Sequence, residues 1–258
     1  MFLSGADVES ATQGAIRLPA AWDVCLQRDC GVLFPDVTRA FLFAHAQKLG
    51  AKLHTDTVIR APIEAPTLFI DGQKHAFDRI IVAAGGWTGR LLPGLLPLIP
   101  KRRVVAWFRP HAPIDLPPVL CVDNEVGLYG MPTPDGFYKI GLHSVGDAID
   151  PDRVEEPNAA EAALLSAQAA AHLPLHDPEP VAMKSCIYTM TPDENFLIAP
   201  SPQDARVLAF SCCSGHGFKY APIYGEIALD WAEDRDSAEL RAFGLRDRAT
   251  QATKLGGA

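Results

Sequence analysis

The sequence lacks the features that mark membrane proteins and nucleic-acid-binding proteins. No uninterrupted apolar run is long enough to cross a bilayer, because the richest stretch, Leu91–Ile99, is broken by Pro93 and Pro97. Basic residues are too few for a nucleic-acid surface: the formal net charge is −8, and the densest basic cluster is the run KRR at 101–103. We therefore expect a cytoplasmic protein with neither a membrane span nor a nucleic-acid partner.

The sequence also lacks the cysteine spacings of a metal site or a disulfide framework. It contains no C-x-x-C pair, and it shows no secretory leader. The six cysteines are Cys25, Cys30, Cys121, Cys186, Cys212 and Cys213. We expect most of them to be small apolar core residues, and we predict no metal site.

The remaining composition is that of an ordinary globular protein. The chain has 258 residues, of which 48% are hydrophobic and 21% are charged. This length allows one large domain or two interleaved domains, with enough volume for a sizeable core.

Local signals predict helices and strands in the first part of the chain. Ser4 is a suitable cap for a helix over 6–12, and Asp36 is a suitable N-cap for a helix that Gly50 ends. The alternating residues over Ala51–Ile59 then predict a strand. A helix, a Gly-Ala step and a strand in succession are typical of an α/β fold.

Glycine turns follow two further strand signals. Asp71-Gly72 lies between two short runs, 67–70 and 73–77, and predicts a hairpin. The apolar segment Arg79–Ala84 predicts a buried strand, and Gly85 follows it directly. Glycine at the end of a buried strand lets the backbone approach a ligand, although it is more often only a turn.

The middle of the chain predicts an antiparallel sheet. Turns separate four candidate strands in a meander, at 103–108, 119–122, 126–129 and 136–142. Further strands are expected at 181–188, 196–199 and 206–211, and helices at 158–171 and 221–232. The last helix carries Pro222 near its first position, where proline is tolerated.

The segment Ser211–Tyr220 (SCCSGHGFKY) carries the sharpest local signal. A strand ends here, Gly215 and Gly217 flank His216, and a helix follows. Such a turn allows close approach to a planar ring, and the backbone N–H groups at a helix start suit an electron-rich heterocycle. The same residues are also typical of an ordinary strand-to-helix turn with a surface lysine.

Two motifs in order extend this signal to a family. SGHGFKY is followed by A-P-x-x-G-E-I, and C-x-Y-T-x-T-P-D-E-x-F precedes it at Cys186–Phe196. Together they resemble the FAD-dependent amine oxidoreductases of the monomeric sarcosine oxidase and N-methyltryptophan oxidase family, within the D-amino acid oxidase-like superfamily. The resemblance extends from Leu3 to about Trp231.

The resemblance implies an α/β fold: the remainder of a Rossmann-like FAD-binding domain interleaved with an antiparallel-sheet substrate domain. The expected boundaries are 1–30 and 101–189 for the substrate domain, 31–100 and 190–245 for the FAD domain, and 246–258 for a disordered tail. No oligomeric state is predicted.

The resemblance also implies the cofactor contacts. Cys186 would be the covalent attachment point of FAD, where its alternative is a buried core thiol. The other expected cofactor-binding residues are Gly215, His216, Gly217, Phe218, Lys219, Val58 and Gly85, with Val58 at the adenine edge.

Five residues would carry the chemistry of the family. Lys219 would pair with the substrate carboxylate, and Lys139 would be the cation that assists reduction of dioxygen. His143 would border the substrate amine, while Tyr129 and Tyr188 would shape its pocket. Each has a simpler alternative: surface lysines, a structural histidine and packing tyrosines.

The implied reaction is FAD-dependent oxidation of a secondary amine, an N-methyl or cyclic amino acid, with dioxygen as acceptor. The products would be an imine, then an aldehyde plus amine, and hydrogen peroxide. A family member should also contain a strand–G-x-G-x-x-G–helix segment, and none occurs in this sequence. Two alternatives therefore stay open: an inactive remnant or a subunit that needs a partner to complete the FAD site, and a dehydrogenase with another electron acceptor.

Overall fold

The computed structural model describes residues 1–55, 59, 61–111, 117–120, 126–173 and 177–245. Val58 and the segment 246–258 therefore lie outside the described residues. The chain forms two compact units. Unit 1 comprises Met1–Thr38, Arg102–Asp147 and Arg153–Cys186, and unit 2 comprises Arg39–Lys101, Ala148–Asp152 and the chain from Ile187 onward.

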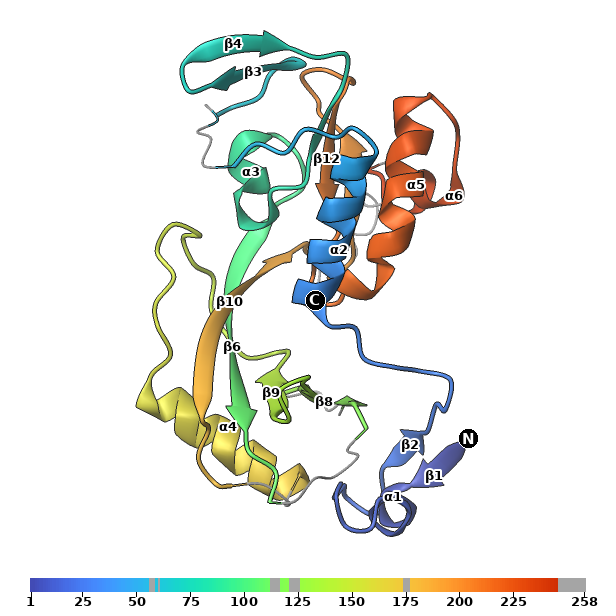
Figure 1. Cartoon of the computed structure of the whole chain (residues 1–258), viewed down its shortest axis with the longest axis vertical. Coiled ribbons are helices and arrows are strands. Elements are labelled where there is room, and N and C mark those ends of the chain that lie inside the picture. The colour runs from blue at the N-terminus through green and yellow to red at the C-terminus, as the bar shows by residue number, and fades with distance from the viewer. Residues whose placement is uncertain (56–58, 60, 112–116, 121–125, 174–176, 246–258) are drawn as a thin grey trace, which may run out of the picture. The chain divides into compact units, whose positions relative to one another are not determined.

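Helices and strands alternate along the described chain (Figure 1). The helices are α1 (Gly5–Ala11), α2 (Pro35–Lys48), α3 (Thr88–Leu91), α4 (Ala159–His172), α5 (Ala221–Ala232) and α6 (Ala238–Ala242), with short 3₁₀ helices η1 (Gly85–Trp87) and η2 (Phe218–Tyr220). The strands are β1 (Phe2–Ser4), β2 (Asp23–Cys25), β3 (Thr67–Ile70), β4 (Gln73–Ala76), β5 (Ile80–Val82), β6 (Ile99–Phe108), β7 (Val119–Leu120), β8 (Leu128–Pro132), β9 (Tyr138–Leu142), β10 (Ala182–Met190), β11 (Leu197–Pro200) and β12 (Val207–Ser211). None of the helices in this described part of the chain is long and apolar enough to cross a membrane.

A five-stranded sheet organises unit 1, in the order β10-β6-β9-β8-β7. The pairs β6–β9, β9–β8 and β8–β7 are antiparallel. This confirms the predicted antiparallel sheet, and the meander holds for β7, β8 and β9. The strand β6 joins it beside β9 rather than beside β7, which follows it along the chain.

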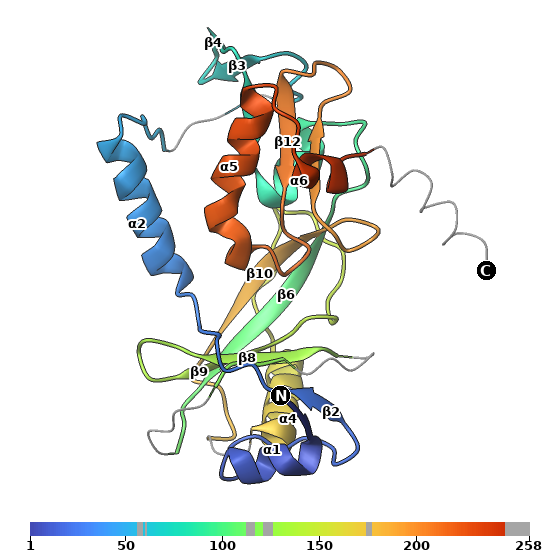
Figure 2. The ribbon, with the colours of Figure 1, turned by 90° about the vertical axis from the view of Figure 1, so that its right-hand side faces the viewer.

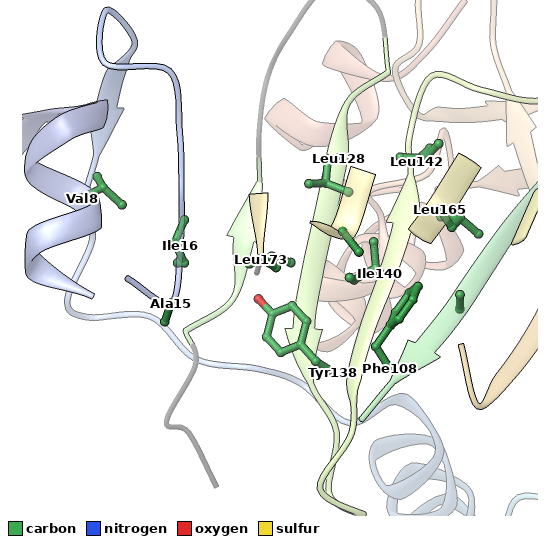
Figure 3. Packing of buried hydrophobic residues seen from close by; sticks show 12 residues of the cluster. Val8, Ala15, Ile16, Phe108, Leu128, Tyr138, Ile140, Leu142, Leu165 and Leu173 are labelled. Carbon is green, nitrogen blue, oxygen red and sulfur yellow. The ribbon is translucent and has the colours of Figure 1, made fainter. Parts of the chain in front are cut away.

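The core of unit 1 lies on one face of this sheet. Because side chains alternate along a strand, Phe108, Tyr138 and Ile140 point to the same side and are almost fully buried (Figure 3). Leu165 of α4 belongs to the same apolar cluster, as does Val8 of α1. The helix α4 therefore covers one sheet face, where it contacts β9 (Figure 2).

The helix α4 begins where the sequence predicted. The Asn158 side chain accepts a hydrogen bond from the Glu161 N–H at 3.0 Å, and the Glu161 carboxylate accepts one from the Asn158 N–H at 2.9 Å. This capping box satisfies two backbone donors that a helix start would otherwise leave unpaired. A second box at Ser4 and Asp7 starts α1 in the same way.

Unit 2 contains a three-stranded sheet in the order β11-β12-β5. The strands β11 and β12 are antiparallel, whereas β12 and β5 are parallel. The helix α5 runs beside β12 in both ribbon views (Figures 1 and 2), and its Ile227 and Trp231 pack with Leu208 and Phe210. The mixed sheet with a covering helix confirms the predicted α/β class.

The hairpin β3–β4 turns at Asp71 and Gly72, as predicted. Both residues have positive φ, 49° and 82°, which is the backbone that matches the twist of paired strands. Asparagine, aspartate and glycine adopt this backbone most readily, so the dipeptide specifies the turn.

Three local predictions are wrong in detail. Residues 51–55 form no strand, whereas Ile59 makes an antiparallel bridge to Ile70 of β3; residues 56–58 of the predicted strand lie outside the described residues. Asp36 lies inside the first turn of α2 rather than at its cap, since Pro35 begins the helix. The strand predicted to be wholly buried over 79–84 is shorter, and its Ile81 is 43% exposed on the face opposite Ile80.

Candidate active site

The face of the five-stranded sheet opposite α4 carries polar and aromatic side chains. Lys139 on β9 faces Trp107 on β6 and Met131 on β8, and all three are half-buried. Cross-strand partners point to the same side of a sheet, so these side chains share one surface, here called the open face. The alternation of β9 thus separates a buried core face from a surface on which chemistry can take place.

Burial lowers the pKa of Lys139 below its ordinary value, and Cys186 on the neighbouring part of unit 1 opposes this shift electrostatically. Desolvation is the larger cause, because an ammonium loses hydration when apolar side chains such as Trp107 and Met131 surround it. Lys139 is therefore half-buried rather than fully exposed on its strand.

Tyr129 owes its position to a glycine on the next strand. Tyr129 pairs with Gly141, and a Cβ added at Gly141 would lie 2.5 Å from both Cζ and the hydroxyl oxygen of Tyr129. The tyrosine ring therefore lies against the bare backbone of β9, two residues from Lys139. Gly141 has no distinctive local pattern in the sequence, and only the strand register, which pairs this glycine with an aromatic residue, identifies it.

His143 follows β9 by one residue and is half-buried. Its backbone N–H donates to the Gly127 carbonyl at 2.9 Å, and a Cβ at Gly127 would lie 3.1 Å from the His143 Cβ. Gly127 has a φ of 60°, so a glycine suits both the backbone and the space.

A second group of predicted residues gathers in unit 2, in the turn after β12. Ser214 and Gly215 take positive φ, 42° and 79°, which reverses the chain before η2. A Cβ at Gly217 would lie 1.9 Å from the Cys212 carbonyl oxygen, so the turn closes too tightly for any side chain there. The Tyr224 hydroxyl of α5 donates to the Gly217 carbonyl at 2.7 Å and fixes the turn against the helix.

Inside unit 2, hydrogen bonds and a ring contact join the two sequence motifs. The Ser214 side chain is buried and donates to the Asn195 carbonyl at 2.8 Å, and the Ser214 N–H donates to the Thr189 carbonyl at 3.0 Å. The His216 ring lies 3.1 Å from the Glu194 carbonyl, measured from Nε2, and 4.7 Å from the Phe196 ring between centroids. The residues of T-P-D-E-x-F thus form the support on which the S-G-H-G turn rests.

Lys219 lies at the exposed rim of this turn. Its Nζ donates to the His216 carbonyl at 2.9 Å and lies 5.0 Å from the centre of the Tyr220 ring. An exposed lysine bound to a single carbonyl keeps further donors available for an incoming carboxylate.

Three cysteines differ in their surroundings. Cys186 is half-buried on β10 in unit 1. In unit 2, burial raises the pKa of Cys212 to about 12, and Cys213 Sγ accepts the Thr189 N–H at 3.2 Å. Because the thiolate is the nucleophile, Cys212 is poorly suited to bond formation at neutral pH.

The predicted site residues therefore fall into two groups according to the unit to which they belong. Unit 1 holds Lys139, His143, Tyr129 and Cys186, and unit 2 holds Tyr188, Gly85 and Gly215–Lys219. Val58 is outside the described residues.

Comparison with known proteins identifies the family of this chain. The sequence model described as FAD dependent oxidoreductase matches residues 2–231. The chain belongs to this family. It is 33% identical over 184 residues to N-methyl-L-tryptophan oxidase from Yersinia pestis (strain Pestoides F), an alignment that covers 68% of this chain and 49% of the relative. The chain thus spans about half the length of the curated relatives it matches.

Solved structures of this FAD-dependent family share the fold. NikD, an unusual amino acid oxidase essential for nikkomycin biosynthesis, matches with a TM-score of 0.80 at 23% identity, covering 94% of this chain and 67% of that one. Glycine oxidase from Geobacillus kaustophilus matches with a TM-score of 0.76 at 22% identity, covering 96% and 66%.

The residues present fit the ring end of FAD, the family's cofactor. Gly85 has a φ of 52° and no atom within 4 Å of the position a Cβ would take, so its backbone lies open to a ligand. The S-G-H-G turn presents backbone in the same unit, in front of a helix start. For the diphosphate of FAD, the printed sequence offers no G-x-G-x-x-G turn.

Proposed function

We propose that this FAD-dependent oxidoreductase oxidises a secondary amine of amino-acid type, an N-methyl or cyclic amino acid, with dioxygen as the final acceptor. The observation that carries the proposal is Lys139, a half-buried lysine on the same open sheet face as Tyr129 and His143. The relatedness to N-methyl-L-tryptophan oxidase, named for a secondary amine, supports the same class.

FAD, when bound, supplies the acceptor for a hydride equivalent from the carbon next to an uncharged amine. The protein's own residues must hold the substrate carboxylate still and favour the neutral amine. Lys219 is proposed to bind the carboxylate, since its ammonium is exposed at the rim of the turn. Tyr129 and Tyr188 are proposed to enclose the amine, and His143 to border it.

Cys186 is proposed as the covalent attachment point of FAD. Lys139, the cation of the open face, interacts electrostatically with Cys186, which supports this assignment. Cys212, the buried alternative, has its pKa raised to about 12 and is unfit for the same bond.

Lys139 is proposed to assist dioxygen. Its position on the open face supplies positive charge where the reduction of dioxygen develops negative charge, in surroundings that screen it less than water does. The proposed products are an imine, which water converts to an aldehyde and an amine, and hydrogen peroxide.

The test compares substrates with and without a carboxylate. We expect an N-methyl amino acid to react about 100-fold faster, in kcat/KM, than the matching N-methylamine, because a lysine–carboxylate pair is charge-assisted. Lys219→Met should abolish this preference and leave the N-methylamine rate unchanged. The exposed Lys74 on β4 provides the control, since Lys74→Met should keep the preference intact. A preference that survives Lys219→Met would contradict the proposed role.

A further inference from the structure

A buried arginine lies on the same side of β6 as Trp107, at the edge of the open face. Arg103 on β6 is only 3% exposed, and its guanidinium donates to three backbone carbonyls rather than reaching solvent. Nε donates to the His143 carbonyl at 2.8 Å, and Nη1 donates to the carbonyls of Gly146 at 3.1 Å and Arg102 at 3.0 Å. Two of these carbonyls belong to the segment that leaves β9 at His143.

This segment is attached on two sides. On one side, the N–H groups of His143 and Ser144 donate to the carbonyls of Gly127 and Val126, at 2.9 and 3.1 Å. On the other side, the Arg103 guanidinium donates hydrogen bonds to the carbonyls of His143 and Gly146. The backbone of His143 is thus hydrogen-bonded at both its N–H and its carbonyl.

The packing around Arg103 leaves little room for another arrangement. Gly146 has a φ of 135°, and a Cβ there would lie 1.9 Å from the Arg102 carbonyl oxygen and 2.7 Å from Nη1 of Arg103. Only glycine lets the segment pass close enough to the guanidinium for the hydrogen bond to form. Burying a guanidinium is unfavourable unless its N–H donors are hydrogen-bonded. The three carbonyls therefore stabilise the buried position of Arg103, and Arg103 in turn holds the carbonyls in place.

We propose that Arg103 is a positioning residue that fixes His143 on the open face. Through the His143 carbonyl it sets the backbone from which the imidazole projects, and so keeps the ring in one orientation beside the substrate amine. The functional part of this inference rests on the proposed amine oxidation; the structural part concerns His143 alone.

Arg102, the preceding residue, provides a matched control. Its side chain is 13% exposed and ion-paired with Glu161, and it donates to the carbonyls of Glu155 at 2.9 Å and Glu156 at 3.0 Å. Arg102 therefore ties β6 to the start of α4, on the core face, and has no side-chain bond to His143 in the described structure.

The first test observes His143 without any turnover. In protein labelled with ¹³C at the histidine Cε1, the His143 signal is assigned from its loss in His143→Asn. We expect one sharp His143 signal in the wild type, and a broadened or doubled signal in Arg103→Gln because the ring takes several orientations. Arg102→Gln should leave this signal unchanged while it lowers the stability.

The second test is a double-mutant cycle on kcat/KM. Arg103→Gln should lower kcat/KM by about 10- to 100-fold, since small misplacements near a reacting group have effects of this size. In the His143→Asn background it should cause no further loss, whereas Arg102→Gln should act independently. Arg103→Lys keeps the charge but cannot donate to the carbonyls of both His143 and Gly146, so its His143 signal should be less broadened than that of Arg103→Gln. This variant replaces Arg103→Gln if Arg103→Gln does not fold.

An unchanged His143 signal in the folded Arg103 variant would overturn the proposal. Equal disturbance by Arg102→Gln would also overturn it, because the effect would then be general loosening of the sheet. A disturbed His143 signal with no effect on kcat/KM would keep the positioning role and refute the proposed role of His143 in amine oxidation.

Discussion

Lys139 combines two properties that ordinary strand lysines do not share. It is half-buried, and desolvation lowers its pKa. Its neighbours on the open face, Trp107 and Met131, supply apolar surface and no negative charge to bind the ammonium. A lysine placed in this way is suited to act on an anion that forms only during the reaction.

Replacing Lys139 should therefore separate the two halves of the proposed reaction. Lys139→Met should slow the reoxidation of reduced enzyme by dioxygen by about 100-fold, and it should change reduction by the amine far less. Stopped-flow absorbance measures both steps. Lys184→Met, at an exposed position of β10, is the control and should alter neither. Equal slowing of both steps by Lys139→Met would assign Lys139 to substrate binding instead.

The thiol of Cys186 should determine whether the flavin stays with the protein. After acid precipitation, wild-type protein should retain the yellow colour in the pellet, and Cys186→Ala should release it to the supernatant. Cys212→Ala is the control: its thiol is buried with a pKa raised to about 12, so the colour should remain in the pellet. Release of the colour from wild-type protein would rule out the covalent bond.

The roles of single residues were the hardest feature to predict from the sequence. Lys139, His143 and Tyr129 were selected through the family resemblance, since a lysine or a tyrosine in a strand has no distinctive local pattern. Trp107, Met131 and Gly141 were missed because their roles depend on register, and register is set by pairing between distant strands.

At the scale of elements, the turn after β12 shows how two motifs become one structure. Ser214 and His216 rest on the segment that follows β10, and Tyr224 of α5 holds Gly217 from the other side. The turn is therefore fixed by three elements before any ligand binds.

Gly217→Ala should disrupt this turn. Its Cβ would lie 1.9 Å from the Cys212 carbonyl oxygen, and the backbone on both sides would have to shift. We expect a loss of about 1–3 kcal/mol in the free energy of unfolding, typical of overpacking. Gly225→Ala in α5 is the control: no atom lies within 4 Å of the added Cβ, so it should stabilise by about 0.5–1 kcal/mol. Urea denaturation would measure the free energy of unfolding of both variants. An unchanged free energy of unfolding in Gly217→Ala would show that the turn is loose.

The Arg102–Glu161 pair makes stability depend on pH. Its hydrogen bond with Arg102 lowers the pKa of Glu161 below the ordinary 4.5, so the carboxylate stabilises the fold above that value and loses its effect as pH falls through the lowered pKa. Glu161→Gln should therefore cost about 2 kcal/mol at neutral pH and less at an acidic pH well below 4.5. Urea denaturation at the two pH values would measure this, and an equal cost at both would show that the charge is not involved.

Elements were predicted well where a local signal specified them. The capping box at Asn158, the Asp71-Gly72 turn and Pro222 at the start of α5 each fix a boundary by short-range chemistry. The segment 51–55 alternates like a strand but forms none, because alternation needs a partner strand that the pattern cannot supply.

At the scale of the whole molecule, the predicted site residues are found in both compact units. Unit 1 provides the open face with Lys139 and Cys186, and unit 2 provides the turn with Gly217 and Lys219. The family and the fold are established by comparison, whereas the substrate, the oxidant and the covalent bond are proposals. The printed residues contain no glycine-rich diphosphate turn. The decisive measurement is made on the purified protein.

That measurement is the visible absorption spectrum of this protein before and after anaerobic addition of an N-methyl amino acid. The account predicts a flavin spectrum that bleaches on addition of the amine, recovers on admission of air, and yields one peroxide for each amine consumed. A matching primary amino acid should bleach the spectrum far more slowly. Protein without flavin, or flavin that no secondary amine bleaches, would contradict the account; bleaching that recovers only with another electron acceptor would contradict the role given to dioxygen.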